Sequence, residues 1–156
     1  MTTSKDVSVW DGSQWVPLAY AVQAGPTGPA GPSGTSAGTS IFTSVSMANN
    51  AYQSSTITIA KSYAVSKVQT DVAARVRLYA DTTTRDADAN RAIGDPLYGD
   101  HGLYMDVVTT AGHLTWFVTP AAIGRAATSA VPITVTNLSG GTSVVTVTLT
   151  TLNLES

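Results

Sequence analysis

The chain has 156 residues, a net charge of −2 and a charged fraction of 12%, about half the share of roughly 25% that is usual in globular proteins. This balance argues against nucleic acid or an anionic membrane surface as the main partner, because both need clustered basic charge. Without cysteine there are no disulfides or thiolate metal sites, and no apolar run reaches the length of about 18 residues that a membrane span needs.

The first predicted element is a β-hairpin within residues 1–24. Asp11 and Gly12 form a strong hairpin turn signal between two short runs that each contain a tryptophan. A two-residue turn would place Trp10 diagonal to Trp15, whereas a four-residue loop would place the two indoles directly opposite each other. Such a hairpin is only marginally stable alone. We therefore expect Trp10, Asp11, Gly12 and Trp15 to form an element that docks onto another surface.

Residues 25–34 repeat the triplet Gly-Pro-X three times and end on a further glycine. The residues that define the repeat are Gly25, Pro26, Gly28, Pro29, Gly31, Pro32 and Gly34. A triple helix requires glycine at every third position, because only glycine fits at the crowded axis where three chains meet. The repeat favours a trimeric collagen-like neck over the alternative of a monomeric Pro/Gly linker. Together with residues 35–40, expected to be a flexible joint, it forms a middle region over 25–40.

Residues 41–156 are predicted to form one all-β domain. Runs rich in β-branched and aromatic residues occupy 41–47, 55–60, 72–79, 103–108, 114–118, 131–136 and 144–150. Short strands separated by turn residues in this way predict an antiparallel β-sandwich or jelly roll. Arg75 and Arg77 share one face of their strand. They are expected either to pair with aspartates or to form a solvated face.

A long loop over residues 81–102 interrupts the strand pattern. It contains the one plausible helix, at 82–92, with Thr84 as the candidate N-cap. Long loops in compact domains often carry function. We therefore expect Arg85, Asp88 and Arg91 to face water and to contact a partner. The alternative is that the loop packs down as a short helix over an open end of the sandwich.

No pattern in the sequence predicts catalysis, a cofactor or a metal site. Residues 86–90 begin like a calcium-binding loop, but Arg91 and Leu97 stand where that loop needs glycine and glutamate. His101 and His113 lack the spacing of metal-binding and hydrolase motifs. Each histidine is therefore expected to lie in a turn.

The sequence gives little support for sugar hydrolysis. The chain has a single glutamate, Glu155, which makes the paired carboxylates of a glycosidase improbable. Sugar binding through Tyr98, Tyr104 and Trp116 is an open alternative, but β-sandwich cores also use such aromatic residues. The core position is the expectation for all three.

The segment WDGSQWV at 10–16, followed by the Gly-Pro-X triplets, resembles the N-terminal portions of tailed-bacteriophage fibre proteins, including those of cyanophages. Residues 75–110 are similar to a β-rich domain of phage tail and other virion structural proteins. The resemblance implies a homotrimer, attachment of the N-terminal hairpin to another virion protein, and a distal domain that faces the host. A host-surface glycan is one candidate target, and no catalytic residue is implied.

The expectation is thus a non-enzymatic structural protein located in the virion, built as a short trimeric fibre on the tail or baseplate. It would need no cofactor or metal and would neither bind nucleic acid nor insert into a membrane. Two alternatives are kept. One is a capsid head fibre or decoration protein, and the other is a small polysaccharide-binding module.

Overall fold

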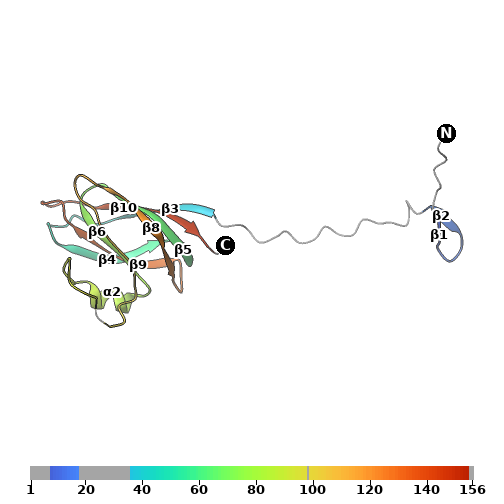
Figure 1. Cartoon of the computed structure of the whole chain (residues 1–156), viewed down its shortest axis with the longest axis horizontal. Coiled ribbons are helices and arrows are strands. Elements are labelled where there is room, and N and C mark those ends of the chain that lie inside the picture. Colours follow the sequence, from blue (N-terminus) through green and yellow to red (C-terminus); the bar gives the residue numbers. More distant parts are fainter. Residues whose placement is uncertain (1–7, 18–35, 98, 155–156) are drawn as a thin grey trace. The chain divides into compact units, whose positions relative to one another are not determined.

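A computed structural model describes residues 8–17, 36–97 and 99–154, which divide into two separate units (Figure 1). The first unit contains an antiparallel hairpin of β1 (Ser8–Trp10) and β2 (Trp15–Pro17). The second unit contains all the other strands and the helix. The predicted neck, residues 25–34, lies outside the described residues.

The second unit consists of two four-stranded antiparallel sheets. The first sheet has the order β3 (Ser36–Thr43), β10 (Thr146–Asn153), β5 (Ser62–Thr70) and β8 (Thr115–Arg125). The second sheet has the order β4 (Tyr52–Thr58), β9 (Ala130–Asn137), β6 (Ala74–Tyr79) and β7 (Leu103–Val108). Successive strands change sheets at every step except from β6 to β7. The predicted antiparallel β-sandwich is confirmed.

The hydrophobic core lies between the two sheets. Alternate residues of each strand point inward, so that Val65 and Leu149 of the first sheet meet Val76, Leu78 and Ile133 of the second in one cluster. All five side chains are fully buried. Burial of each such side chain contributes about 1.5–3 kcal/mol, which makes this shared interior the main source of stability.

The first strand of the sandwich begins earlier than the sequence pattern indicates. β3 starts at Ser36, and its residues pair continuously with β10, from Ser36 opposite Asn153 to Thr43 opposite Thr146. The expectation that residues 36–40 form a flexible joint, and that the domain begins at 41, is therefore wrong. Serine and glycine in this segment are tolerated because β3 is an edge strand with one partner.

One central strand, β5, was not expected at all. Residues 62–65 are buried on both faces, so the polar and apolar alternation that reveals a half-exposed strand is missing from the first half of β5. Tyr63 in β5 lies opposite Gly124 of β8, and a Cβ atom at Gly124 would collide with the tyrosine ring. The glycine leaves the space into which the ring packs.

Candidate functional site

The long loop after β6 packs onto the outer face of the second sheet. Its helix, α2 (Thr82–Asp88), contacts β6 and β9. Asp81 caps the helix, because its carboxylate accepts a hydrogen bond of 2.8 Å from the backbone N–H of Thr84. The alternative of a short packed helix is thus confirmed, although it covers a sheet face rather than an open end. Thr84 is not the cap.

Arg77, on the outer face of β6, is 1% exposed and holds the end of α2 in place. Its Nη1 donates to the carbonyl oxygen of Asp88 at 2.6 Å, and its Nη2 donates to the carbonyl oxygen of Ala89 at 2.9 Å. Nη1 also lies 3.1 Å from Oδ2 of Asp88, which accepts a hydrogen bond of 2.7 Å from the Tyr79 hydroxyl. The guanidinium therefore satisfies carbonyls that a helix C-terminus leaves free.

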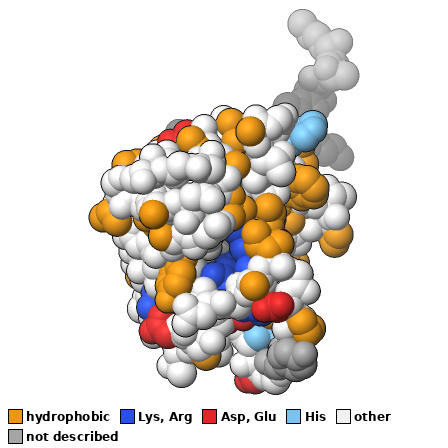
Figure 2. Space-filling view, turned by 90° about the vertical axis from the view of Figure 1, so that its left-hand side faces the viewer, with side chains coloured by type: hydrophobic (Ala, Val, Ile, Leu, Met, Phe, Trp, Pro, Cys, Tyr) orange, Lys and Arg blue, Asp and Glu red, His pale blue; other side chains and the backbone are white. Residues whose placement is uncertain are grey.

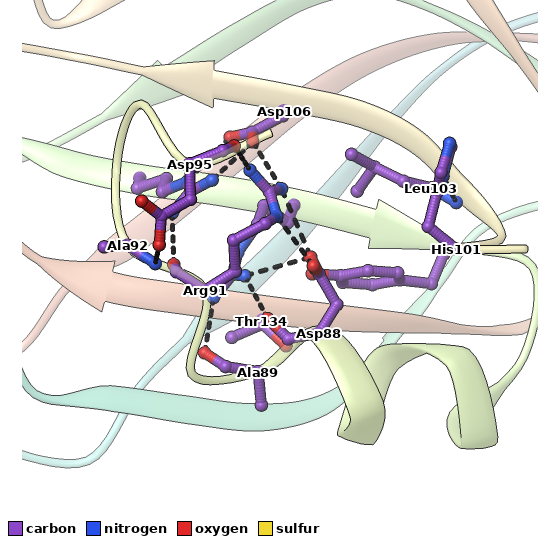
Figure 3. A network of polar contacts seen from close by, with 12 residues as sticks. Asp88, Ala89, Arg91, Ala92, Asp95, His101, Leu103, Asp106 and Thr134 are labelled. Carbon is purple, nitrogen blue, oxygen red and sulfur yellow. Dashed lines mark hydrogen bonds and ion pairs between the residues drawn. The ribbon is translucent and has the colours of Figure 1, made fainter. Parts of the chain in front are cut away.

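Arg75 and Arg91 extend this network across the same face, and Figure 3 shows Arg91 between Asp88 and Asp106. Nε and Nη2 of Arg75 donate to the two carboxylate oxygens of Asp106 on β7, at 2.8 and 2.6 Å. This two-point contact is the strong form of an ion pair. Arg91 bridges the two halves: its Nη2 is 2.9 Å from Oδ2 of Asp106, and its Nε is 2.6 Å from Oδ1 of Asp88.

The network holds its aspartates in the ionised form. Burial alone would raise the pKa of Asp88, but hydrogen bonds from Arg91 and Tyr79 and the arginine charges hold it below its usual value. The pKa of Asp106 is likewise lowered, because the hydrogen bonds and charges of Arg75 and Arg91 outweigh the effect of burial. These pairs are thus arranged to stabilise fixed charges rather than to exchange protons.

The three loop residues expected to face a partner are instead mostly covered. The side chain of Asp88 is 11% exposed and that of Arg91 is 12% exposed, and both are bound within the network. Arg85 is similarly covered and donates from Nη1 to the carbonyl oxygen of Ser55 at 2.7 Å. The prediction that these side chains face water is wrong, and so is a solvated face for Arg75 and Arg77.

A pocket of about 440 Å³ lies between this network and the end of the second sheet. Three arginines line it, namely Arg75, Arg77 and Arg91, together with the exposed side chains of Asn50 and Tyr52. Figure 2 shows basic side chains recessed in a hollow between apolar and uncharged groups. Sequence reasoning missed this pocket, because its residues come from segments far apart in the chain.

The outer face of the first sheet has a different character. Register places Phe117, Lys67, Thr150 and Thr39 in one row on this face. Neighbouring rows add Ile41 and a patch formed by Ile123 and Leu152. Phe117 is 72% exposed and Ile123 is 69% exposed. Lys67 is the charged side chain in the middle of the face, Gln69 lies in the row of Ile41, and the other side chains of these rows are threonines and apolar groups.

The N-terminal hairpin has the four-residue loop rather than the two-residue turn. Trp10 pairs directly with Trp15, and their ring centroids lie 5.7 Å apart. The Asp11 carboxylate closes the loop by accepting from the backbone N–H groups of Ser13 and Gln14, which lower its pKa. Gly12 adopts a φ of 102°, in the left-handed region that favours glycine. Both indoles are exposed.

The remaining candidate residues do not form a reactive cluster. Within the described ranges, no group of three or more His, Cys, Asp or Glu residues is placed to hold a metal ion. Nδ1 of His101 accepts from the backbone N–H of Leu103, and His113 pairs with Thr110 across a turn, as expected for both histidines.

The three aromatic residues considered for sugar binding do not share a site. Trp116 is 50% exposed at the edge of the first sheet, so its expected core position is wrong. Tyr104 is partly buried and donates its hydroxyl proton to the carbonyl oxygen of Arg125 at 2.6 Å. Tyr98 lies outside the described residues.

Comparisons with known proteins identify no relative of this chain. No protein-family model, no curated protein and no solved structure matches the chain. None of the helices in the described part of the chain is long and apolar enough to cross a membrane.

Proposed function

We propose that this protein is a non-enzymatic structural component of a bacteriophage virion, a short homotrimeric fibre on the tail or baseplate. The outer face of the first sheet is the observation that carries the proposal. Monomeric proteins rarely leave a contiguous face of exposed apolar side chains without a partner. Phe117 and Ile123 on β8, and Ile41 on β3 at the opposite edge, are exposed apolar groups of this face that packing against another chain would cover.

The partner for this face is a second copy of the same chain. The Gly-Pro-X triplets end at Gly34, and β3 begins at Ser36, directly after them. Because a triple helix brings three chains together, it would deliver three copies of β3 to one axis. β3 is the edge strand of the first sheet, so the same geometry brings three nearly uncharged sheet faces close together.

The strand order supports a virion role by analogy. Eight strands in the two orders β3-β10-β5-β8 and β4-β9-β6-β7 correspond to the double Greek key of a jelly roll, an architecture found in viral capsid and lectin domains. Fold analogy alone does not assign function. The jelly-roll analogy agrees here with the resemblance of the N-terminal segment to fibre proteins. It also agrees with the trimer that the Gly-Pro-X triplets favour.

The hairpin is the proposed attachment element. Trp10 and Trp15 form an exposed aromatic pair on a small ribbon, and tryptophan is enriched at the energetic centres of interfaces. Particles assembled with Trp10→Ala and Trp15→Ala together should lack this protein in virion mass spectrometry. The free protein should remain folded. Normal incorporation would place the anchor elsewhere, and labelled micrographs would distinguish a tail fibre from a head fibre.

Light scattering tests the trimer directly. The full chain should have the mass of a trimer at micromolar concentration, and the variant carrying Phe117→Lys and Ile123→Lys should be a folded monomer. Ile93→Lys is the matched control, because Ile93 is also exposed but lies in the loop beyond α2. A monomeric wild type, or a double variant that stays trimeric, would contradict the proposed interface.

A further inference from the structure

The arginine-lined pocket has the size and position of a ligand site. Its volume of about 440 Å³ lies within the range of about 300–1,000 Å³ typical of small-molecule pockets. Asn50 follows β3 along the chain, and Leu138 follows β9, so the pocket rim lies at the end of the sandwich opposite Ser36. The chain enters the domain at Ser36.

The wall of the pocket is cationic. The chain has eight basic residues, and three of them, Arg75, Arg77 and Arg91, line this one cavity. No aspartate or glutamate is among the lining residues, since Asp88 and Asp106 approach the guanidinium groups from outside the cavity lining. The hydrogen bonds to these ionised aspartates fix the arginines in place and balance two of their three charges, so one net positive charge remains for an anionic group.

One donor beneath the wall is without a partner. Nε of Arg77 is fully buried and makes no hydrogen bond to any described residue. Leaving a buried N–H of a charged group unpaired is costly. This Nε is shielded from solvent, so the Arg77 guanidinium acts on an anion in the pocket through its charge rather than through this N–H.

The other lining groups suit a sugar ring better than a bare inorganic anion. The amides of Asn50 and Asn90 can both donate and accept hydrogen bonds, as sugar hydroxyls require. Tyr52 and Ile93 are exposed and offer apolar surface to the C–H face of a ring. A simple phosphate would use the guanidinium groups and leave these four side chains without a role.

We infer that this pocket binds an acidic sugar unit, with its carboxylate toward the arginines and its hydroxyls toward Asn50 and Asn90. The inference rests on the proposed fibre function for the source of the sugar, an acidic glycan on the host surface. The pocket itself is formed within one chain, so binding can be measured whatever the oligomeric state.

Ligand-observed NMR on the full chain tests the inference with three probes. Glucuronate should bind with a Kd on the order of 1 mM, while glucose and inorganic phosphate should each bind at least about tenfold more weakly. No binding of glucuronate would overturn the inference. Equal binding of phosphate would reduce the pocket to an anion site, and equal binding of glucose would remove the role of the arginines, so either result also overturns it.

Variants at the rim locate the binding without disturbing the buried arginines. Tyr52→Ala and Asn90→Ala should each weaken glucuronate binding by about tenfold or more and leave the circular dichroism spectrum unchanged, because both side chains are exposed. Trp116→Ala is the matched control, since this exposed aromatic residue lies at the edge of the other sheet. If Trp116→Ala lost glucuronate binding while Tyr52→Ala and Asn90→Ala retained it, the assignment of the sugar to this pocket would be overturned. Light scattering on the same samples reports the trimer independently.

Discussion

The two outer faces of the sandwich differ in how they are covered. The second sheet presents Arg75, Arg77 and Tyr79, and the chain covers them with its own loop and α2. The first sheet presents threonines and apolar side chains such as Phe117 and Ile123, which stay exposed. Buried charges need precisely placed partners from the same chain, whereas exposed threonines and apolar side chains need no such partners to remain stable.

The largest effect should come from removing the carboxylate that joins α2 to the second sheet. Asp88→Ala leaves the Arg77 guanidinium and the Tyr79 hydroxyl without that carboxylate, and breaking a buried ion pair costs about 3–5 kcal/mol. Urea unfolding should show this loss. Asp86→Ala in the same helix is the control, because the side chain of Asp86 is 61% exposed. Equal stability of the two variants would show that the network contributes little.

Low pH should selectively destabilise the ion pairs that hold the loop and α2 on the second sheet. The folded-state pKa values of Asp88 and Asp106 are lowered, so their contribution is complete above the unfolded value of about 3.9 and is lost as pH falls below it. Asp106→Asn should cost about 1.5–3 kcal/mol at neutral pH and should reduce the acid-dependent part of the loss. Thermal melts of the wild type and the variant between pH 7 and pH 2.5 measure the loss at neutral pH and the acid-dependent part. An unchanged pH profile in the variant would contradict this account.

A smaller effect, of opposite sign, is expected in the core beneath the first sheet. The Tyr63 hydroxyl is buried and has no hydrogen-bond partner among the described residues, and burial raises its pKa strongly. Tyr63→Phe should therefore be neutral or stabilising by up to about 1 kcal/mol in urea unfolding. A clear destabilisation would mean that the hydroxyl binds an ordered water.

The smallest effect on folding should come from the exposed face itself. Phe117→Ser changes a side chain that is 72% exposed, so the free energy of unfolding of a single chain should change by less than about 0.5 kcal/mol. Its trimer affinity should nevertheless fall. Sedimentation equilibrium and urea unfolding of dilute monomer separate the two quantities. A large loss of monomer stability would mean that Phe117 belongs to the core.

How far the sequence predicts this molecule depends on what each residue contacts. The alternation of polar and apolar residues predicted the half-exposed strand around Ile57, because each residue type follows from the face on which it lies. It missed β5, where burial of residues 62–65 on both faces interrupts the pattern. Arg75 and Arg77 were correctly placed on one face, but their burial depends on Asp88 and Asp106, whose positions are set by tertiary packing.

The candidate site was harder to predict for the same reason. Nothing local marks Asn50 or Tyr52 as neighbours of Arg75, because the pairing of β4 with β9, and of β9 with β6, brings them together. The length and charge of the loop over residues 81–102 predict a functional role, and this loop does border the pocket. The sequence predicts a partner outside the chain for its charged side chains Arg85, Asp88 and Arg91, whereas their contacts lie within the domain.

The register of β3 has a mechanical consequence. Ser36 lies opposite Asn153, so the start of β3 and the end of β10 are neighbours at one end of the sandwich. A force pulling on these two ends would unzip the strands one pair at a time. A force between Ser36 and the opposite end of the domain would instead load the hydrogen bonds of β3 in shear, all at once. The domain should therefore resist tension along its length far better than tension between its termini.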